Sequence, residues 1–497
     1  MQMIVRSVFF IISIQVCQSA RVLLSGMALS PSHMQSILPF AHRMADRGHE
    51  VAIYIELLRP RNLTSKVTQY TMLIDNQYVR DMQEGPEHVD MLWRLESNPL
   101  HLVMPWYAGV LVTEHVLANM SIEFHQILKQ KWDLIVMDSL FSTTAIAQGM
   151  YHKDAAKIIF HTSIIEPVAA MYRGLFWPIS TAAPIFLRHE TATWYVQKFW
   201  DRVAAANDML LGGFLYTVVL EHLVHRAIGQ VVEDFSFETW ITGAQLGVVD
   251  YFDRLDWPMP INRQHLYVGA SCKTPKPLPG DLEKFVNASS SKGTILIAFG
   301  NNVDWNRLPQ KDVQVFVEVV SKLSSFRVVW GYNGPKLDLP PHVRTVAWLP
   351  QTDLLFHPKT KLFFSHGGLK SVKETLCAEV PVLFLPIFAE QLRNSFLARK
   401  NGFAEYVNKK KLNAVDVLSK IEKITSDHRY KTNVKRAKAL YVDRIMDSLD
   451  EAVFFAEKLI TNTHFRNSFG AKQRIVWYRS IYAPQVALLL LAIIISR

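Results

Sequence analysis

The sequence predicts an α/β protein of two domains, each with a doubly wound parallel sheet, that face each other across a cleft. Short apolar segments of strand length alternate with amphipathic segments of helix length along most of the chain. The alternation stops in a Pro- and Ser-rich stretch, residues 265–291, and then restarts. The chain has 497 residues, which is enough for two cores of about 200 residues each. We therefore expect an N-terminal domain at 20–264, a linker at 265–291 and a C-terminal domain at 292–470.

The N-terminal domain opens with a β-α-β pattern. Val22–Leu24 and Val51–Ile55 are typical of strands, and Ser32–Arg47 between them has apolar residues at helical spacing. Gly48 fits the position just after a helix. Asp133–Asp138 is a further buried strand that ends in a carboxylate. Strands joined by helices in this way form a parallel sheet.

Residues 160–240 differ from the rest of this domain, because their aromatic side chains lie on long helical apolar patterns. Such a segment can form core, an acceptor pocket or a membrane-facing surface, and the pattern favours core. The aromatic residues that stand out are Phe176, Trp177, Phe186, Trp194 and Trp200.

The C-terminal domain repeats the alternation, and residues 418–459 are mostly helical. Ligands of doubly wound sheets bind outside the C-terminal ends of the strands, so the residues that follow each strand are candidates for a site. The predicted strands are Thr294–Phe299, Arg327–Trp330, Val343–Trp348, Lys361–Ser365 and Val382–Pro386.

Both ends of the chain carry targeting patterns. Arg6, the apolar run Val8–Val16 and the small residues that follow predict a signal peptide over 1–19. Val486–Ile495 is an unbroken apolar run, and the segment 475–495 around it approaches the roughly 20 residues of a spanning helix. We expect a lumenal body in the endoplasmic reticulum with a C-terminal membrane anchor; a lipid-anchor processing signal is the alternative.

Charge and cysteine content exclude several classes. The net charge of +10 comes mostly from scattered Lys and Arg, with one triple at Lys409–Lys411, so nucleic acid is not an expected partner. Cys272 and Cys377 remain after the signal peptide. Two cysteines are too few for a disulfide scaffold, and their spacing is not that of metal ligands. Sequons at Asn62, Asn119 and Asn287 give weak support for lumenal exposure.

His366-Gly367-Gly368 follows an apolar strand and opens a helix. Two glycines let a ligand approach the backbone, and the free N–H groups of a helix N-terminus suit a diphosphate. His366 can add a hydrogen bond. Taken alone, the three residues are also typical of an ordinary strand-to-helix turn.

The residues around this turn strengthen the diphosphate interpretation. Trp348-Leu349-Pro350-Gln351 lies upstream, Glu374 lies two turns into the helix, and Glu390-Gln391 follows the next strand. Together these residues resemble the donor-binding motif of the UDP-glycosyltransferase family, which includes the UDP-glucuronosyltransferases. Weaker matches at Ala298–Gly300 and Leu449–Val453 extend the resemblance along the chain. It implies the GT-B fold, two facing Rossmann-like domains, in agreement with the alternation pattern.

The resemblance also implies a role for each residue type. Trp348 would stack on uracil, Gln351 would bind the nucleoside edge, and Glu374 would accept hydrogen bonds from the ribose hydroxyls. The His-Gly-Gly turn would hold the diphosphate, and Glu390 with Gln391 would hold the sugar. The UDP-sugar-binding residues expected from the resemblance are Gly300, Asn301, Trp348, Leu349, Gln351, His366, Gly367, Gly368, Lys370, Ser371, Glu374, Glu390 and Gln391.

The family places a base histidine and a supporting aspartate at positions that match His33 and Asp138. His33 lies where the first strand gives way to the first helix, and Asp138 closes a later strand. An imidazole can take the proton of an acceptor hydroxyl, and a carboxylate can orient the ring and stabilise the imidazolium. Without the resemblance, His33 would be a capping or surface histidine. No metal or cofactor is expected beyond the UDP-sugar substrate.

Three residues depart from the family pattern. Lys370 stands where many members have Asn, Glu390 where many have Asp, and Asn301 where Ser is usual. These changes bear on the identity of the sugar more than on the binding of UDP. As the predicted donor, UDP-glucose is slightly preferred over UDP-glucuronate. The predicted reaction is inverting transfer to a small lipophilic alcohol or phenol. A non-catalytic UDP-sugar-binding membrane protein is the alternative, and a homo-oligomer is left open.

Overall fold

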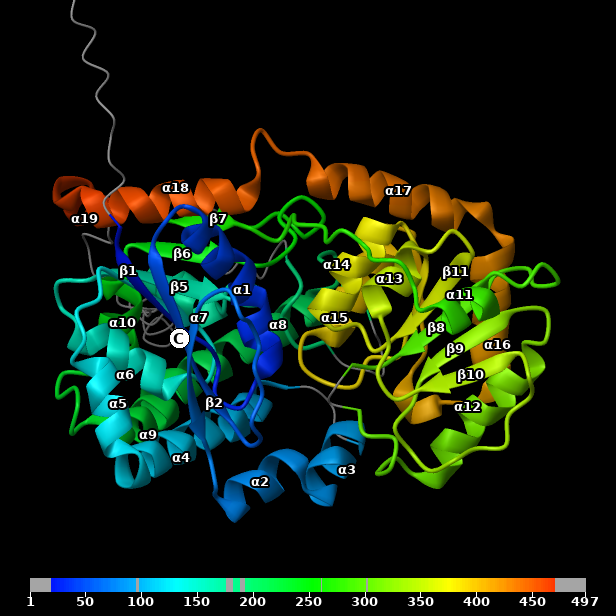
Figure 1. Ribbon diagram of the computed structural model, residues 1–497, viewed down its shortest axis with the longest axis horizontal. Helices are drawn as coiled ribbons and strands as arrows, with labels where there is room; N and C mark the ends of the chain where they lie inside the picture. The colour runs from blue at the N-terminus through cyan, green and yellow to red at the C-terminus, as the bar shows by residue number, and fades with distance from the viewer. Residues whose placement is uncertain are drawn as a thin grey trace, which may run out of the picture.

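A computed structural model of the chain describes residues 19–94, 98–175, 182–187, 193–260, 262–300 and 303–469. It places two parallel sheets in two domains that lie side by side (Figure 1). The predicted signal peptide (apart from Ser19) and the predicted C-terminal anchor lie outside these residues, as do Asn301, Phe176 and Trp177.

The N-terminal domain is built on a seven-stranded sheet in the order β3-β2-β1-β4-β5-β6-β7. All neighbouring strands pair in parallel. The strands are β1 Arg21–Ser25, β2 Glu50–Leu57, β3 Thr68–Leu73, β4 Leu134–Asp138, β5 Ala156–His161, β6 Leu246–Val249 and β7 His265–Tyr267. The helices are α1 Pro31–Asp46, α2 Gln77–Glu84, α3 Pro86–Arg94, η1 Pro99–Leu102, α4 Val103–Asn119, α5 Ser121–Leu128, α6 Thr143–Tyr151, α7 Pro167–Tyr172, α8 Phe199–Phe214, η2 Leu215–Leu220, α9 Glu221–Ile228 and α10 Phe237–Gly243.

The first β-α-β unit forms where the sequence predicts it. Met34, Ile37, Ala41 and Met44 lie on one face of α1 and are buried against the sheet. Gly48 follows the helix at φ +90°, a left-handed conformation that glycine adopts without strain. Strand β4 is buried at every position, as expected of a parallel strand covered on both faces.

The C-terminal domain is built on a six-stranded parallel sheet in the order β10-β9-β8-β11-β12-β13. Its strands are β8 Thr294–Ala298, β9 Arg327–Gly331, β10 Val343–Val346, β11 Thr360–Ser365, β12 Val382–Phe384 and β13 Ala404–Tyr406. Its helices are α11 Gly280–Val286, α12 Gln310–Lys322, α13 Gln351–Phe356, α14 Leu369–Ala378, α15 Gln391–Lys400, η3 Lys409–Lys411, α16 Ala414–Ser426 and α17 His428–Val442. The five predicted strands are present. The edge strand β13 was missed, because three residues are too few for a periodic signal.

The domain limits differ from the predicted ones at two places. His265–Tyr267, at the start of the predicted linker, is β7 of the first sheet, and Gly280–Val286 within the same stretch is α11. The last two helices, α18 (Ser448–Thr461) and α19 (Thr463–Phe469), return to the N-terminal domain. Leu449 and Val453 of α18 are buried in the same apolar cluster as the inner face of α1. Helical periodicity alone does not say which domain such a helix covers.

Residues 160–240 provide core and surface together. Leu220 and Val224 are fully buried, whereas Trp200 and Phe214 on the same helical run are exposed. Among the described residues, one run, Phe199–Ile228, has the length and apolar composition of a membrane span, and its most apolar part is one-third buried. A core helix meets the same criteria, so the run alone assigns no membrane crossing.

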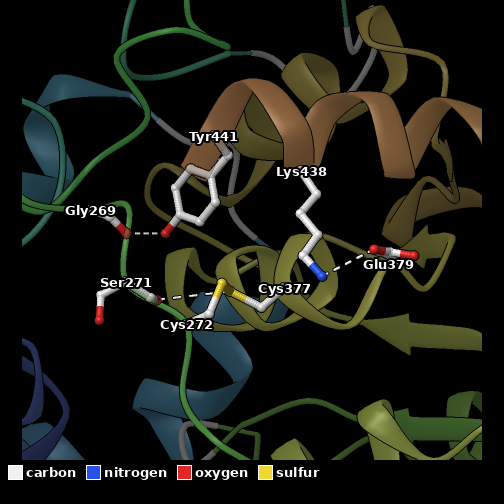
Figure 2. Close-up of a disulfide and its surroundings, with 7 residues drawn as sticks. All are labelled: Gly269, Ser271, Cys272, Cys377, Glu379, Lys438 and Tyr441. Atoms are coloured by element: carbon white, nitrogen blue, oxygen red, sulfur yellow. Dashed lines mark hydrogen bonds and ion pairs between the residues drawn. A yellow bond between two sulfur atoms is a disulfide. The ribbon is translucent and has the colours of Figure 1, made fainter. Parts of the chain in front are cut away.

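Cys272 and Cys377 form a disulfide, which the sequence analysis did not predict. It joins the segment between the domains to the last turn of α14 (Figure 2). The Tyr441 hydroxyl of α17 donates a hydrogen bond to the Gly269 carbonyl in the same segment. The segment is thus fixed to two helices of the C-terminal domain.

Glu56 is a buried carboxyl at the end of β2 that should make stability pH-dependent. Its Oε1 accepts hydrogen bonds from Tyr54 Oη (3.1 Å) and Thr144 Oγ1 (2.7 Å), yet burial raises the pKa of Glu56 from 4.5 to about 7. Between these pH values the unfolded chain loses the proton and the folded chain keeps it. The free energy of unfolding should therefore fall as pH rises from about 4.5, and the fall should be complete just above pH 7.

Replacing Glu56 by glutamine removes this titration and preserves the shape of the side chain. Between pH 5 and pH 8, we expect the free energy of unfolding to fall less in Glu56→Gln than in wild type, by on the order of 3 kcal/mol. Urea unfolding of both proteins at the two pH values measures the difference. Identical pH dependence in the two proteins would contradict the assignment.

Candidate active site

The predicted site residues lie at the points where strand order reverses in the two sheets. In the first sheet this point is between β1 and β4, and in the second it is between β8 and β11. Ligands of open parallel sheets bind at such points, outside the C-terminal strand ends. His33 and Asp138 follow or close β1 and β4, whereas Gly300 and His366 follow β8 and β11. Each domain thus presents its predicted residues at the expected edge.

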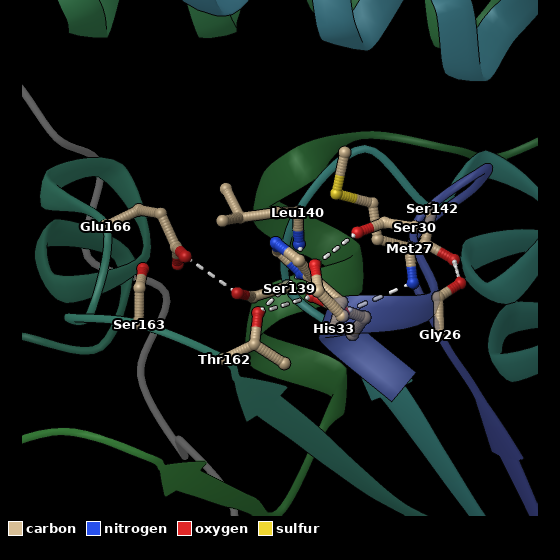
Figure 3. Close-up of polar contacts among 12 residues, drawn as sticks. Gly26, Met27, Ser30, His33, Ser139, Leu140, Ser142, Thr162, Ser163 and Glu166 are labelled. Carbon is tan, nitrogen blue, oxygen red and sulfur yellow. Dashed lines mark hydrogen bonds and ion pairs between the residues drawn. The ribbon is translucent and has the colours of Figure 1, made fainter. Parts of the chain in front are cut away.

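His33 and Asp138 form a hydrogen-bonded pair. Nδ1 of His33, which is labelled in Figure 3, lies 3.0 Å from Asp138 Oδ2. The Asp138 side chain is fully buried, and 23% of the His33 side chain is exposed. Among the described residues, His33 Nε2 has no hydrogen-bond partner. The pair therefore has the form of a base, with one ring nitrogen fixed inside the protein and the other left for a ligand.

Backbone and hydroxyl donors hold the Asp138 carboxylate in place. Met27 N donates to Oδ2 at 3.2 Å, and Leu140 N donates to Oδ1 at 3.0 Å. The Thr162 hydroxyl donates to Oδ1 at 3.3 Å and lies 2.7 Å from His33 Nδ1. These contacts offset the cost of burying a charge and fix the orientation that His33 needs.

Thr162 is a member of this site that the sequence analysis missed. It is the first residue after β5, the strand next to β4 in the sheet. Its position at the C-terminal end of a neighbouring strand was a usable signal, because such ends converge on one edge. The family resemblance had assigned it no role.

Glycine is required at position 367 by the packing of α15. The backbone of Gly367 has φ +87°, and a Cβ there would lie 2.9 Å from Ser395 Oγ and 3.0 Å from the Gln391 carbonyl oxygen. Gly368 is the N-cap of α14, so the free N–H groups of the helix start here. The turn therefore has the close backbone and the helix N-terminus that a diphosphate requires.

His366 lies beside Gly300, where a Cβ would be 3.0 Å from the imidazole ring. Burial lowers the pKa of His366 to about 4, so the ring is neutral near pH 7. Its Nδ1 is buried and has no hydrogen-bond partner among the described residues. Since buried polar atoms are seldom left unbonded, His366 is suited to a hydrogen bond with a ligand rather than to a charge interaction.

Three of the predicted UDP-sugar-binding residues come together between α13 and α14. Gln351 Nε2 donates to Glu374 Oε2 at 2.5 Å and lies 3.4 Å from Ser371 Oγ. Thr352 Oγ1, which the sequence analysis did not single out, donates to Glu374 Oε1 at 2.6 Å. The carboxylate is therefore held at the position where ribose hydroxyls would compete for its oxygens.

Trp348 is exposed over 66% of its surface, which excludes a role as a core residue. The Arg61 guanidinium of the N-terminal domain lies 5.7 Å from the centre of its ring. Leu349 packs on the end of β9, because a Cβ on Gly331 would be 2.8 Å from Leu349 Cδ1. Trp348 is thus a mostly exposed aromatic side chain beside Arg61 of the other domain, and an exposed ring is what base stacking requires.

Lys370 joins the predicted donor-binding residues to the segment that carries His33. Lys370 Nζ donates a hydrogen bond to the carbonyl oxygen of Ser32, next to His33. Burial lowers the pKa of Lys370 to about 7. Burial also raises the pKa of the Glu390 carboxyl. The C-terminal domain therefore contacts the N-terminal domain at the residue next to His33.

Gln391 differs in its surroundings from Glu390. Its side chain is 4% exposed, and its Oε1 accepts hydrogen bonds from the backbone N–H groups of Ile387 (2.9 Å) and Phe388 (3.2 Å). This oxygen therefore shapes the turn that carries Glu390. A contact between Gln391 and the sugar would therefore be made by Nε2.

Comparison with known proteins identifies the family. A family model described as "UDP-glucoronosyl and UDP-glucosyl transferase" matches residues 21–496. The chain belongs to this family. Human UDP-glucuronosyltransferase 1A10 is 24% identical over 490 residues, covering 94% of this chain and 87% of the relative. A UDP-glucuronosyltransferase of Pleuronectes platessa is 32% identical over 270 residues, covering 53% of this chain and 57% of the relative.

Solved structures of glycosyltransferases share the fold. The calicheamicin glycosyltransferase CalG4 aligns with a TM-score of 0.61 at 15% identity, over 90% of this chain and all of its own. A UDP-glucosyltransferase from Polygonum tinctorium aligns with a TM-score of 0.59 at 17% identity, over 88% and 99% of the two chains. The predicted GT-B fold and the family resemblance are confirmed, and this UDP-glycosyltransferase takes its sugar from a UDP-sugar donor.

Proposed function

We propose that this UDP-glycosyltransferase transfers a hexose from its UDP-sugar to a hydroxyl of a small lipophilic acceptor, with inversion at the anomeric carbon. The observation that carries the proposal is a contact between the domains beside the His33–Asp138 pair. Lys370, in the first turn of the helix that follows the His-Gly-Gly turn, donates to the carbonyl oxygen of Ser32, the residue before His33.

In the proposed reaction His33 Nε2 takes the proton of the acceptor hydroxyl. The oxygen attacks the anomeric carbon while the bond from that carbon to the β-phosphate oxygen breaks, and UDP leaves. A single displacement of this kind inverts the anomeric configuration. Asp138 stabilises the imidazolium that forms, as a buried carboxylate bonded to Nδ1 does in other general-base pairs.

Groups of the protein itself would stabilise the charge of the leaving UDP, with no metal or cofactor. The diphosphate would be bound by the N–H groups at the start of α14, by the Lys370 ammonium and by a hydrogen bond from His366. Preorganised donors of this kind stabilise charge that develops in the transition state. Lys370 replaces the amide of many relatives, and its Nζ, which bonds to the Ser32 carbonyl, would become fully charged when a nearby diphosphate raises its pKa from about 7.

The state of Arg393 favours an uncharged hexose over glucuronate. Arg393 is the cation nearest in sequence to Glu390 and Gln391, and a glucuronate carboxylate would require such a partner. Its side chain is fully buried, and Nη2 lies 2.8 Å from Asp256 Oδ1. The charge of this arginine is therefore already paired. UDP-glucuronate remains the second candidate, because relatives that match most of this chain are named glucuronosyltransferases.

An apolar pocket of the N-terminal domain supports a lipophilic acceptor. Its lining is mostly apolar, as a site for a lipophilic molecule requires. One wall is α7, which begins five residues after Thr162, and another contains Tyr216 in the π-helical turn η2. Ile185, Met209 and Tyr216 are among its lining residues.

We also propose a lumenal body in the endoplasmic reticulum, held by a C-terminal anchor over 475–495. The Cys272–Cys377 disulfide supports an oxidising compartment. The sequon residues Asn62, Asn119 and Asn287 are all exposed, as glycosylation requires. The test of location is glycosidase sensitivity of the membrane fraction; full resistance together with reduced cysteines would contradict the proposal.

The reaction is tested by a donor screen with purified protein. UDP-glucose, other UDP-hexoses and UDP-glucuronate are each combined with a panel of phenols and lipophilic alcohols, with UDP release as the readout. We expect turnover with at least one UDP-hexose and little with UDP-glucuronate. Turnover with UDP-glucuronate alone would reverse the donor assignment, and retention of configuration in the product would exclude the single displacement.

A further inference from the structure

Asn394 lies behind the His-Gly-Gly turn, on the face of α15 that packs against it. Its side chain is fully buried, and Nδ2 donates to the Gly367 carbonyl oxygen at 3.0 Å. On its other side, Oδ1 accepts from the Tyr251 hydroxyl at 2.8 Å. Tyr251 belongs to the N-terminal domain, in the segment between β6 and β7. The turn that faces the donor is thus hydrogen-bonded, through one amide, to the opposite domain.

A buried arginine extends this chain of hydrogen bonds. Arg393 Nη1 donates to the Tyr251 hydroxyl oxygen at 2.7 Å, and Nη2 bonds to Asp256 at 2.8 Å. The guanidinium also lies 4.7 Å from the centre of the Trp257 ring. Arg393 and Tyr251 are at most 1% exposed, so water has little access to these bonds.

The donors and acceptors of this network fix its direction. Because Arg393 donates to the Tyr251 oxygen, the single hydroxyl proton of Tyr251 is available for Asn394 Oδ1. Because Asn394 Oδ1 accepts this proton, the Nδ2 group of the same amide faces the Gly367 carbonyl. The amide orientation is therefore set by the N-terminal domain and cannot reverse without breaking two buried hydrogen bonds.

The orientation of one peptide unit follows from this contact. The Gly367 carbonyl and the Gly368 N–H belong to the same peptide, which is trans like every peptide bond of the described residues. In a trans peptide the two groups point in opposite directions. Since the carbonyl points to Asn394, the Gly368 N–H points away from α15, at the N-cap of α14 where the diphosphate is expected.

We propose that Asn394 and Tyr251 are positioning residues that hold the Gly367–Gly368 peptide with its N–H toward the donor diphosphate. The inference rests on the proposed diphosphate site and adds a dependence of donor affinity on the N-terminal domain. Within the described residues the Tyr251 hydroxyl bonds to Asn394 and Arg393, which are not predicted donor-site residues, yet its loss should weaken UDP binding. Position 367 must be glycine for the same arrangement, because α15 leaves no room for a side chain.

The test measures UDP affinity by calorimetry, together with KM for donor and acceptor and the melting temperature. We expect Asn394→Ala to raise the dissociation constant of UDP about tenfold and Tyr251→Phe about threefold, with acceptor KM unchanged. The double variant should be no weaker than Asn394→Ala, because both changes act through one peptide. Tyr251→Phe also reports on the network if Asn394→Ala does not fold.

Tyr441→Phe is the matched control. Tyr441, like Tyr251, is a buried tyrosine whose hydroxyl makes a hydrogen bond, but its partner is the Gly269 carbonyl and not Asn394. We expect it to lower the melting temperature without changing UDP affinity. Equal effects of Tyr251→Phe and Tyr441→Phe on UDP affinity would show a merely structural network and overturn the inference. A wild-type protein that fails to bind UDP would instead overturn the proposed function.

Discussion

Replacement of His33 by alanine is expected to lower kcat about 1000-fold, while UDP binds with nearly unchanged affinity. A positioned general base contributes about 100- to 10,000-fold to a rate, and no other described residue pairs an exposed ring nitrogen with a buried carboxylate at this strand edge. UDP would lie on the C-terminal domain, so its binding does not require the imidazole. Initial rates and UDP calorimetry on the same preparation separate the two effects.

His42→Ala provides the control, because His42 is also a partly buried histidine of α1. Its Nε2 bonds to Thr64 Oγ1 at 2.8 Å, on the outer part of the domain. We expect its kcat to stay within about twofold of wild type. Asp138→Asn should lose activity as well, and combining it with His33→Ala should add little, because the two residues act as a unit. A His33→Ala enzyme with normal kcat would exclude the proposed base.

The fold was largely predictable because its signals are local and repeated. Each strand of a covered parallel sheet is a short apolar run, and each helix between strands has a single apolar face, as in β4 and α1. The placement of His33, Asp138 and His366 followed from topology, since C-terminal strand ends meet where strand order reverses. The assignment of these residues to a sugar transferase came from the family resemblance.

Contacts between distant segments were not predictable from one sequence. The strand end placed Thr162 at the right edge of the sheet, but its contact with His33, like that of Asn394 with Gly367, depends on how separate elements pack. The return of α18 to the N-terminal domain has no periodic signature, because its apolar face would fit either sheet. These contacts join strands and helices that are each predictable from the sequence, and the function of a two-domain enzyme depends on them.

The disulfide was likewise not predictable, because a separation of 105 residues carries no information on whether two cysteines pair. The structure gives the disulfide a clear position. It closes a loop from the segment between the domains to the end of α14, the helix that also carries Ser371 and Glu374. The cross-link therefore lies on the element that is expected to hold the ribose, and its loss should affect the C-terminal domain first.

Replacing both cysteines by serine is expected to lower the free energy of unfolding by about 3–5 kcal/mol. A cross-link that closes a loop of 105 residues removes conformational freedom from the unfolded chain, and long loops give the upper part of the usual range. Cys377 is also 3% exposed, so a serine hydroxyl there adds a desolvation cost. Urea unfolding followed by tryptophan fluorescence measures the change.

A reducing agent distinguishes the cross-link from the effect of the substitutions. Tris(2-carboxyethyl)phosphine should shift the wild-type transition toward that of the double variant and leave the double variant unchanged. Each single variant, Cys272→Ser or Cys377→Ser, should show the same loss as the pair, because either one removes the bond. Single losses that add up to the double loss would mean that the cysteines contribute through packing and not as a disulfide.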